Sequence, residues 1–299
     1  MPYSLTRNFP FGKIKQNHSK LNKTERNGKG EKQKMKKKIL AALTAGILTT
    51  GLMTGTVFAA DTEVKGDENL KGEVYAFIAA SLSNSMEEIQ KDFNELYPNV
   101  TIYYSADSSG TLQTQIEEGA PVDLFFSAAE SNMDALEEQG LIDAATRKDV
   151  LQNEIVLIAP QGETAVTSFE TILDSEPQIA LGEAESVPAG KYAQEIFTNL
   201  GIWDEVKSHA VFASNVREVL AWVEAGEADC GVVYATDAKT SDAVQVVSSA
   251  PADGPQVLYP AAIIKDCANP EGAQAFLDFL TSEEAGEVFA SYGFTFLAE

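Results

Sequence analysis

Two serine-containing segments have the residue types that a small anion needs. Ser81 follows an apolar run and precedes an amphipathic stretch, and Ser109 has the same position after the next apolar run. At such a junction a hydroxyl group and the unpaired N–H groups of a helix start can face one anion together. Gly110 lets the backbone approach a ligand closely. Serine is also a common helix cap, so each segment alone is weak evidence for a binding site.

Three further candidate donors come from the second half of the chain. Pro188 fixes φ near the start of the predicted helix at 190–200, and the N–H groups that follow it, including that of Ala189, remain unpaired and available. Either Ser214 or Asn215 can cap a later helix, whose first turn then holds Val216. Tyr234 ends an apolar run and can present its phenolic O–H, although a lone tyrosine at such a place is more often part of the core.

Enzymatic and cation-binding alternatives have less support. A serine hydrolase could use Ser81 or Ser109, but the chain has no Gly-x-Ser-x-Gly elbow, and His209 is the one histidine after residue 60. Paired acidic residues such as Glu117 and Glu118 lie on amphipathic stretches, where a solvated helix face explains them. We therefore expect neither catalysis nor a cation site.

Short apolar runs alternate with amphipathic stretches from residue 73 onward. After the first run, Met86, Ile89 and Phe93 recur at the spacing of one helix face. The apolar runs predict strands at 74–79, 100–104, 122–126, 154–159, 178–181, 230–234, 244–247 and 258–264. The amphipathic stretches predict helices that include 190–200, 215–225, 270–280 and 283–289, and the first two end at a glycine. This alternation predicts an α/β fold with largely parallel sheets covered on both faces.

The beginning of the chain has the composition of a secretory leader. Residues 1–38 hold 12 lysines and arginines against 2 acidic residues, and residues 39–59 carry no charge. We expect residues 1–34 to be a basic extension without a structural role and residues 35–59 to be a signal peptide, with cleavage before Asp61. A retained anchor is the alternative. The protein is then exported, to the periplasm or the extracellular face of the cytoplasmic membrane.

The rest of the chain has the composition of an acidic globular protein. Beyond residue 38 there are 10 basic and 43 acidic residues, a formal charge of −33, so nucleic acid is a poor partner. The 299 residues are 44% hydrophobic, which is enough for one large or two moderate cores. Cys230 and Cys267 are the only cysteines, and either a disulfide between them or a buried thiol at Cys230 is compatible with export.

Seven short motifs follow one another in an order that is typical of one family. They are AASL at 79–82, SSGTL at 108–112, EEGAPVDLFFSA at 117–128, VPAGKYA at 187–193, NVREVLAWVE at 215–224, GVVYATDA at 231–238 and YGFTF at 292–296. Together they resemble the molybdate-binding proteins of bacterial ABC importers, from residue 73 to residue 296. The resemblance implies a two-lobed periplasmic-binding-protein fold of type II, with a mixed, mostly parallel sheet in each lobe and the ligand in the interlobe cleft. Lobe one would comprise residues 60–152 and 253–299, and lobe two residues 153–252.

The resemblance also implies a function and a set of ligand donors. The protein would capture molybdate with high affinity as a monomer, without a further cofactor, and deliver it to an ABC permease with its cytoplasmic ATPase. The donors would be Ser81 and Ser109 from lobe one and Ala189, Val216 and Tyr234 from lobe two, with no cationic side chain. Asp107 departs from the family pattern, and we expect it to turn outward. Tungstate is the nearest alternative ligand, and a tethered oxyanion sensor is the alternative role.

Overall fold

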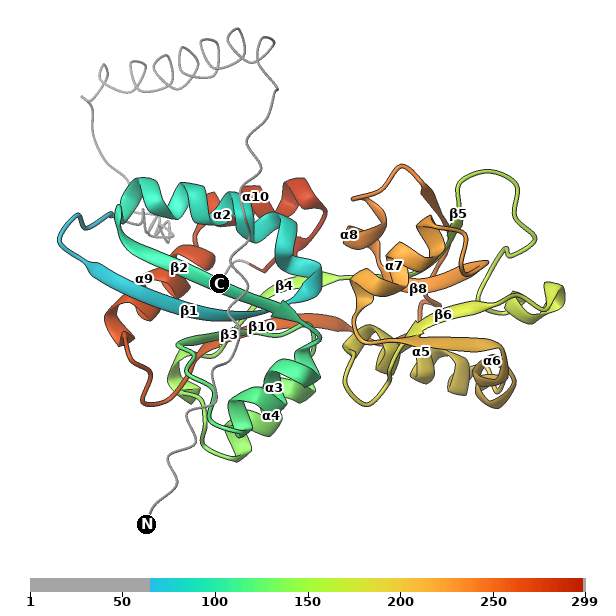
Figure 1. Cartoon of the computed structure of the whole chain (residues 1–299), viewed down its shortest axis with the longest axis horizontal. Helices are drawn as coiled ribbons and strands as arrows, with labels where there is room; N and C mark the ends of the chain where they lie inside the picture. The colour runs from blue at the N-terminus through green and yellow to red at the C-terminus, as the bar shows by residue number, and fades with distance from the viewer. Residues whose placement is uncertain (1–64, 298–299) are drawn as a thin grey trace, which may run out of the picture. The chain divides into compact units, whose positions relative to one another are not determined.

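The computed structural model describes residues 65–297, and within them the strands form two sheets (Figure 1). The first sheet has the order β11-β4-β10-β3-β1-β2 and the second the order β7-β6-β8-β5-β9. The strands of the first sheet are β1 (Lys71–Ala79), β2 (Asn99–Asp107), β3 (Leu124–Phe126), β4 (Lys148–Asn153), β10 (Val257–Ile263) and β11 (Thr295–Phe296). Those of the second sheet are β5 (Ile155–Pro160), β6 (Ile179–Gly182), β7 (Ala210–Ala213), β8 (Cys230–Tyr234) and β9 (Val244–Ser249).

The chain passes between the two sheets twice, once between β4 and β5 and once between β9 and β10. Glu154 alone separates β4 from β5. Strand β4 extends to Asn153, one residue past the predicted end of the N-terminal part of lobe one. The lobe limits themselves stay a prediction.

Both sheets mix parallel and antiparallel pairings, and most strands of each sheet run in one direction, as predicted for mixed, mostly parallel sheets. In the first sheet β1 is parallel to β2 and β3, whereas β10 is antiparallel to β3 and β4. In the second sheet β6 is parallel to β7 and β8, whereas β5 is antiparallel to β8 and β9. The chain leaves the first sheet along β4 and returns to it along β10, so these two neighbouring strands run in opposite directions. It likewise enters the second sheet along β5 and leaves it along β9, and this pair is antiparallel as well.

Helices accompany both sheets, as the α/β prediction requires. Those that follow strands of the first sheet are α2 (Ser83–Leu96), α3 (Ser109–Glu117), α4 (Glu130–Glu138), α9 (Pro270–Leu280) and α10 (Glu283–Tyr292). Those of the second are α5 (Pro188–Asn199), α6 (Trp203–His209), α7 (Val216–Glu224) and the short α8 (Ala235–Ala238). Three short 3-10 helices are η1 (Ala80–Leu82), η2 (Ala144–Thr146) and η3 (Ile172–Ser175). The C-terminal helices return to the first sheet, because α9 contacts β1 and β10 and α10 contacts α2.

The predicted apolar face of α2 is buried against the C-terminal helices. Met86, Ile89 and Phe93 are fully buried. The ring of Phe93 packs edge-on against Phe276 and Phe279 of α9, with centroid separations of 5.0 and 5.7 Å. Aromatic rings bury large apolar areas, so these contacts hold α9 against α2.

The search for membrane-spanning helices covers the described residues, whereas the predicted leader does not fall on them. Among residues 65–297, none of the helices has the length and apolar character that crossing a bilayer requires. The predicted basic extension, signal peptide and cleavage point lie outside the described residues.

Candidate functional site

The five predicted ligand donors line one small cavity. Ser81 and Ser109 reach it from segments that follow strands of the first sheet, and the other three from segments of the second sheet. The set is Ser81, Ser109, Ala189, Val216 and Tyr234, and each of these residues is at most 4% exposed. Hydrogen bonds made here are shielded from water and are therefore stronger than surface ones. That these groups hold a ligand stays a prediction.

The hydroxyl of Ser109 is arranged to donate a hydrogen bond. Ser108 acts as the cap of α3, since its Oγ accepts from the N–H of Thr111 at 3.4 Å. Ser109 is therefore released from the capping role that serines often have. Its Oγ accepts a hydrogen bond from the N–H of Ala128 at 2.9 Å, so its own O–H hydrogen is left for another acceptor.

Asp107 is among the residues that line the cavity and is half-buried, and the outward turn of its carboxylate stays a prediction. Its Oδ1 accepts a hydrogen bond from the N–H of Ser108 at 2.7 Å. This local bond between neighbouring residues holds the carboxylate at the turn between β2 and α3. The hydrogen bond satisfies one oxygen of an acid that otherwise opposes an anion.

The second half of the site consists of two helix starts. Val187, which precedes α5, has no side-chain cap, and Ala189 is the second residue of this helix. Asn215 is the cap of α7, because its Oδ1 accepts from the N–H groups of Arg217 and Glu218 at 3.0 and 3.1 Å. The first N–H groups of a helix lack intrahelical acceptors, so those of Ala189 and Val216 remain available to a ligand.

Tyr234 ends β8 and directs its hydroxyl across to the first sheet. The O–H donates to the carbonyl oxygen of Ala128 at 3.5 Å, the upper limit of a hydrogen bond. A partner at this distance is readily exchanged for a better acceptor. Burial raises the pKa of Tyr234 well above its ordinary value, with a contribution from the neighbouring Tyr259. Its phenol therefore stays protonated, as a donor must.

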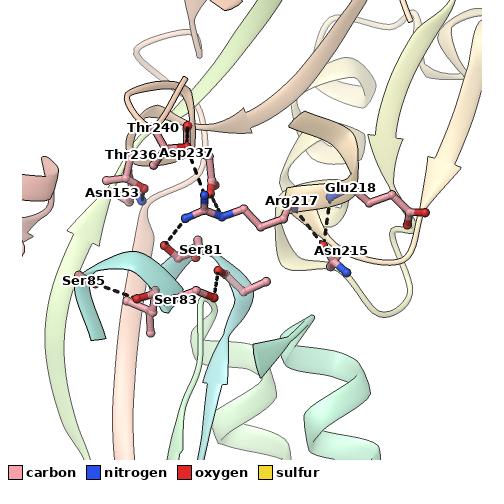
Figure 2. Close-up of polar contacts among 12 residues, drawn as sticks. Ser81, Ser83, Ser85, Asn153, Asn215, Arg217, Glu218, Thr236, Asp237 and Thr240 are labelled. Atoms are coloured by element: carbon pink, nitrogen blue, oxygen red, sulfur yellow. Dashed lines mark hydrogen bonds and ion pairs between the residues drawn. The ribbon is translucent and has the colours of Figure 1, made fainter. Parts of the chain in front are cut away.

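Arg217 lies beside the cavity, although the sequence analysis assigned it no role. Its Nη2 donates to the carbonyl oxygen of Ser81 at 3.2 Å, and its Nη1 donates to Thr240 Oγ1 at 3.2 Å (Figure 2). Its Nε forms an ion pair with the fully buried Asp237 at 2.8 Å. Each of the three guanidinium nitrogens thus has one partner, and Arg217 is not among the residues that line the cavity. Its contacts join α7 to η1, across 136 residues of sequence.

The carboxyl group of Asp237 should titrate near neutral pH. Burial raises its pKa from the ordinary 3.8 to about 6, while Arg217 opposes this shift. The folded protein then binds this proton more tightly than the unfolded chain, so the contribution of Asp237 to stability is largest below pH 3.8 and falls until about pH 6. Carboxyl NMR should show a midpoint near 6, and Arg217→Met should move it upward. A midpoint below 4.5 would contradict this assignment of the cause.

A backbone contact joins the two halves of the site directly. The N–H of Gly110, in the first turn of α3, donates to the carbonyl oxygen of Ser186 at 2.9 Å. A Cβ atom at Gly110 would lie 2.5 Å from that oxygen and 2.7 Å from the Cα of Ser186. Only glycine permits this approach. Lys191 of α5 makes a further cross-contact, from Nζ to Ser131 Oγ at 3.1 Å.

Residues 65–297 contain no group of three or more histidine, cysteine or acidic residues that could hold a metal ion. Cys230 is buried and Cys267 is partly buried, and the structure has both as free thiols. Of the alternatives open at the sequence level, the structure therefore has a buried thiol at Cys230.

Comparison with known proteins places the chain in a family. A family model described as bacterial extracellular solute-binding protein matches residues 74–295. A putative ABC transporter substrate-binding lipoprotein of Bacillus subtilis, YvgL, is 42% identical over 86% of this chain and 96% of its own length. The molybdate-binding protein ModA of Haemophilus influenzae is 37% identical over 86% of this chain and 99% of its own length. The chain therefore belongs to the bacterial extracellular solute-binding proteins.

Solved structures agree with this assignment. The substrate-binding domain of a putative molybdenum ABC transporter from Clostridium difficile is 39% identical, covers 75% of this chain and 99% of that chain, and superposes with a TM-score of 0.59. The periplasmic molybdate-binding protein of Azotobacter vinelandii has a TM-score of 0.67 at 23% identity, covers 76% of this chain and 100% of that chain, and supports the fold alone. The two-lobed α/β fold of periplasmic binding proteins is thus confirmed.

Family membership decides several of the sequence-level alternatives. The relatives are substrate-binding transport proteins, which excludes the serine hydrolase reading of Ser81 and Ser109. The protein is exported and works outside the cytoplasmic membrane, as its family does. Proteins of this class act together with a membrane permease and its ATPase.

Proposed function

We propose that the protein captures molybdate outside the cytoplasmic membrane and delivers it to the permease of an ABC importer. The observation that carries the proposal is the convergence of five buried hydrogen-bond donors, from both sheets, on one cavity without a lysine or arginine in its lining. The molybdate-binding relatives, of which one is 37% identical, support the choice of anion. The protein acts as a monomer and needs no cofactor besides the anion.

The chemistry of the donors fits a tetrahedral oxyanion without protons. Molybdate near neutral pH is fully deprotonated, so its oxygens only accept hydrogen bonds, and the hydroxyl and N–H groups of the cavity satisfy them. Hydrogen phosphate has a proton to donate and leaves it unpaired in such a site, which costs about 1–3 kcal/mol. The helix starts at Ala189 and Val216 add partial positive charge that offsets the charge of the anion.

Calorimetry with four anions tests the proposal. Molybdate and tungstate, which match in charge and nearly in size, should bind tightly. Sulfate should bind much more weakly, because its shorter bonds leave some donors out of reach, and phosphate should be rejected because of its proton. A protein that binds phosphate at least as tightly as molybdate, or binds none of the four, refutes the proposal.

Single substitutions at the hydroxyl donors should each weaken molybdate binding. Ser81→Ala, Ser109→Ala and Tyr234→Phe each remove one buried donor, which corresponds to about 1–3 kcal/mol in the free energy of binding. The matched control is Ser208→Ala, which removes an exposed serine hydroxyl of α6 that bonds only locally, to Glu205 O. The affinity of the control for molybdate, measured by calorimetry, should equal that of the unaltered protein. An unchanged affinity in all three site variants would show that the anion binds elsewhere.

A further inference from the structure

The hydroxyl of Ser81 is the last member of a buried chain of polar groups whose other members do not line the cavity. Ser81 Oγ lies 3.0 Å from the hydroxyl of Tyr259, and Asn153 Nδ2 donates to that same hydroxyl at 3.2 Å. Asn153 Nδ2 also donates to Thr236 Oγ1 at 2.8 Å. All four residues are at most 5% exposed. Neither Asn153 nor Tyr259 is among the residues that line the cavity.

The backbone fixes which way the amide of Asn153 points. Its Oδ1 accepts a hydrogen bond from the N–H of Glu154 at 2.9 Å, so the opposite end of the amide is the donor end. The two hydrogens of Nδ2 then go to Thr236 and to Tyr259. Figure 2 shows Asn153 beside Thr236, close to Ser81. Because the oxygen of Tyr259 accepts from Asn153, its own proton needs another acceptor.

The 3.0 Å contact allows either hydroxyl to donate, and we assign Ser81 Oγ as that acceptor. Tyr259 is fully buried, and burial raises its pKa well above the ordinary value, so it keeps its proton. If Ser81 donated to Tyr259 instead, the phenolic proton would have to be accepted by the neighbouring hydroxyl of Tyr234, which is itself one of the proposed ligand donors. With Tyr259 as the donor, the hydrogen of the Ser81 hydroxyl is left to point into the cavity.

We propose that Asn153 and Tyr259 are positioning residues that fix Ser81 as a hydrogen-bond donor and thereby select oxyanions that carry no proton. The inference rests on the proposed function and adds to it the residues that set the polarity of the site. These two residues act only through Ser81. Their effect should therefore appear in the choice between protonated and unprotonated anions rather than in affinity alone.

Sulfate and hydrogen phosphate are the pair of probes that isolates this effect. At about pH 8 phosphate is mainly a dianion with one proton. Sulfate has the same charge and nearly the same size but no proton. The ratio of their dissociation constants, measured by competition with molybdate, therefore reports the proton and cancels charge and size.

Asn153→Asp should reverse the chain of hydrogen bonds at nearly constant shape. The carboxylate accepts the proton of Tyr259, so Ser81 donates to Tyr259 and presents a lone pair to the cavity. The added negative charge weakens the binding of both dianions equally. The ratio of their dissociation constants then reports only whether Ser81 offers the cavity a donor or an acceptor. We expect the ratio to move toward hydrogen phosphate by roughly tenfold. Tyr259→Phe should move it in the same direction by less, because Ser81 is then merely free to turn.

A half-buried tyrosine elsewhere in the first sheet supplies the control. Tyr104 donates its hydroxyl to Met86 O at 3.2 Å, and Tyr104→Phe should leave the ratio unchanged. If neither anion competes in the unaltered protein, Asn153→Asp should bring about competition by hydrogen phosphate. An unaltered protein that binds no oxyanion refutes the proposed function. If the unaltered protein binds molybdate but neither Asn153→Asp nor Tyr259→Phe changes the ratio of dissociation constants, only this inference is refuted. The same holds if neither anion competes in the unaltered protein and hydrogen phosphate competes in neither variant.

Discussion

Arg217→Met should lower the free energy of unfolding by about 3 kcal/mol, because it leaves the buried carboxyl group of Asp237 without its ion-pair partner. The side chain of Asp237 is 0% exposed, whereas that of Arg217 is 25% exposed, so the loss lies at the lower end for a broken buried pair. The same substitution removes the donor to the carbonyl oxygen of Ser81 and should weaken molybdate binding. Urea unfolding and calorimetry measure the two effects.

Two further variants separate the ion pair from general damage. Arg217→Met combined with Asp237→Asn removes the unpaired charge and should regain much of the lost stability. Arg147→Met breaks ion pairs with the exposed carboxylates of Asp134 and Glu137, and should cost less than about 1 kcal/mol. Equal losses for the two single arginine substitutions would contradict the assignment.

Gly110→Ala should weaken molybdate binding roughly tenfold to a hundredfold. Its Cβ would lie 2.5 Å from the carbonyl oxygen of Ser186, which belongs to the backbone and so cannot rotate away as a flexible side chain could. Overpacking of this kind costs about 1–3 kcal/mol. We expect it to keep the halves of the site from closing over the anion. Calorimetry gives the affinity. The X-ray scattering profile of Gly110→Ala should change less on addition of saturating molybdate than that of the unaltered protein, because the halves of the site close less.

A second glycine provides the control for Gly110→Ala. Gly119 has φ +83° at the end of α3, and no atom lies within 4 Å of the position that a Cβ would occupy there. Gly119→Ala strains the backbone and should lower stability by about 1 kcal/mol without changing affinity. Tight molybdate binding by Gly110→Ala would show that the contact with Ser186 is dispensable.

The elements that the sequence predicts best are those with a strong apolar pattern. Strand β8 (Cys230–Tyr234) and helix α9 (Pro270–Leu280) have the predicted bounds. Gly201 and Gly226, which follow α5 and α7, have the positive φ that ends a helix. Strand β7 and helix α6 were missed, because β7 is four residues long and mostly half-buried and α6 buries only Val206.

The sequence predicts the ligand donors of the candidate site but not the residues that hold those donors in place. The motifs point to five donors, and the structure brings all five to one cavity. Arg217 contacts Ser81 across 136 positions, and Asn153 contacts Tyr259 across 106, so no local pattern signals either contact. The position of Asp107 depends on a hydrogen bond with its neighbour Ser108, which composition does not reveal.

The strand order of the first sheet has a consequence for when this protein can fold. Strand β10 lies between β3 and β4, so it fills a gap between strands that precede it by more than one hundred residues. Until residue 257 has been synthesised, β3 and β4 have no common neighbour and this sheet stays in two pieces. An unfinished chain thus remains unable to complete its largest sheet, a delay that suits a polypeptide which must cross a membrane before it becomes compact.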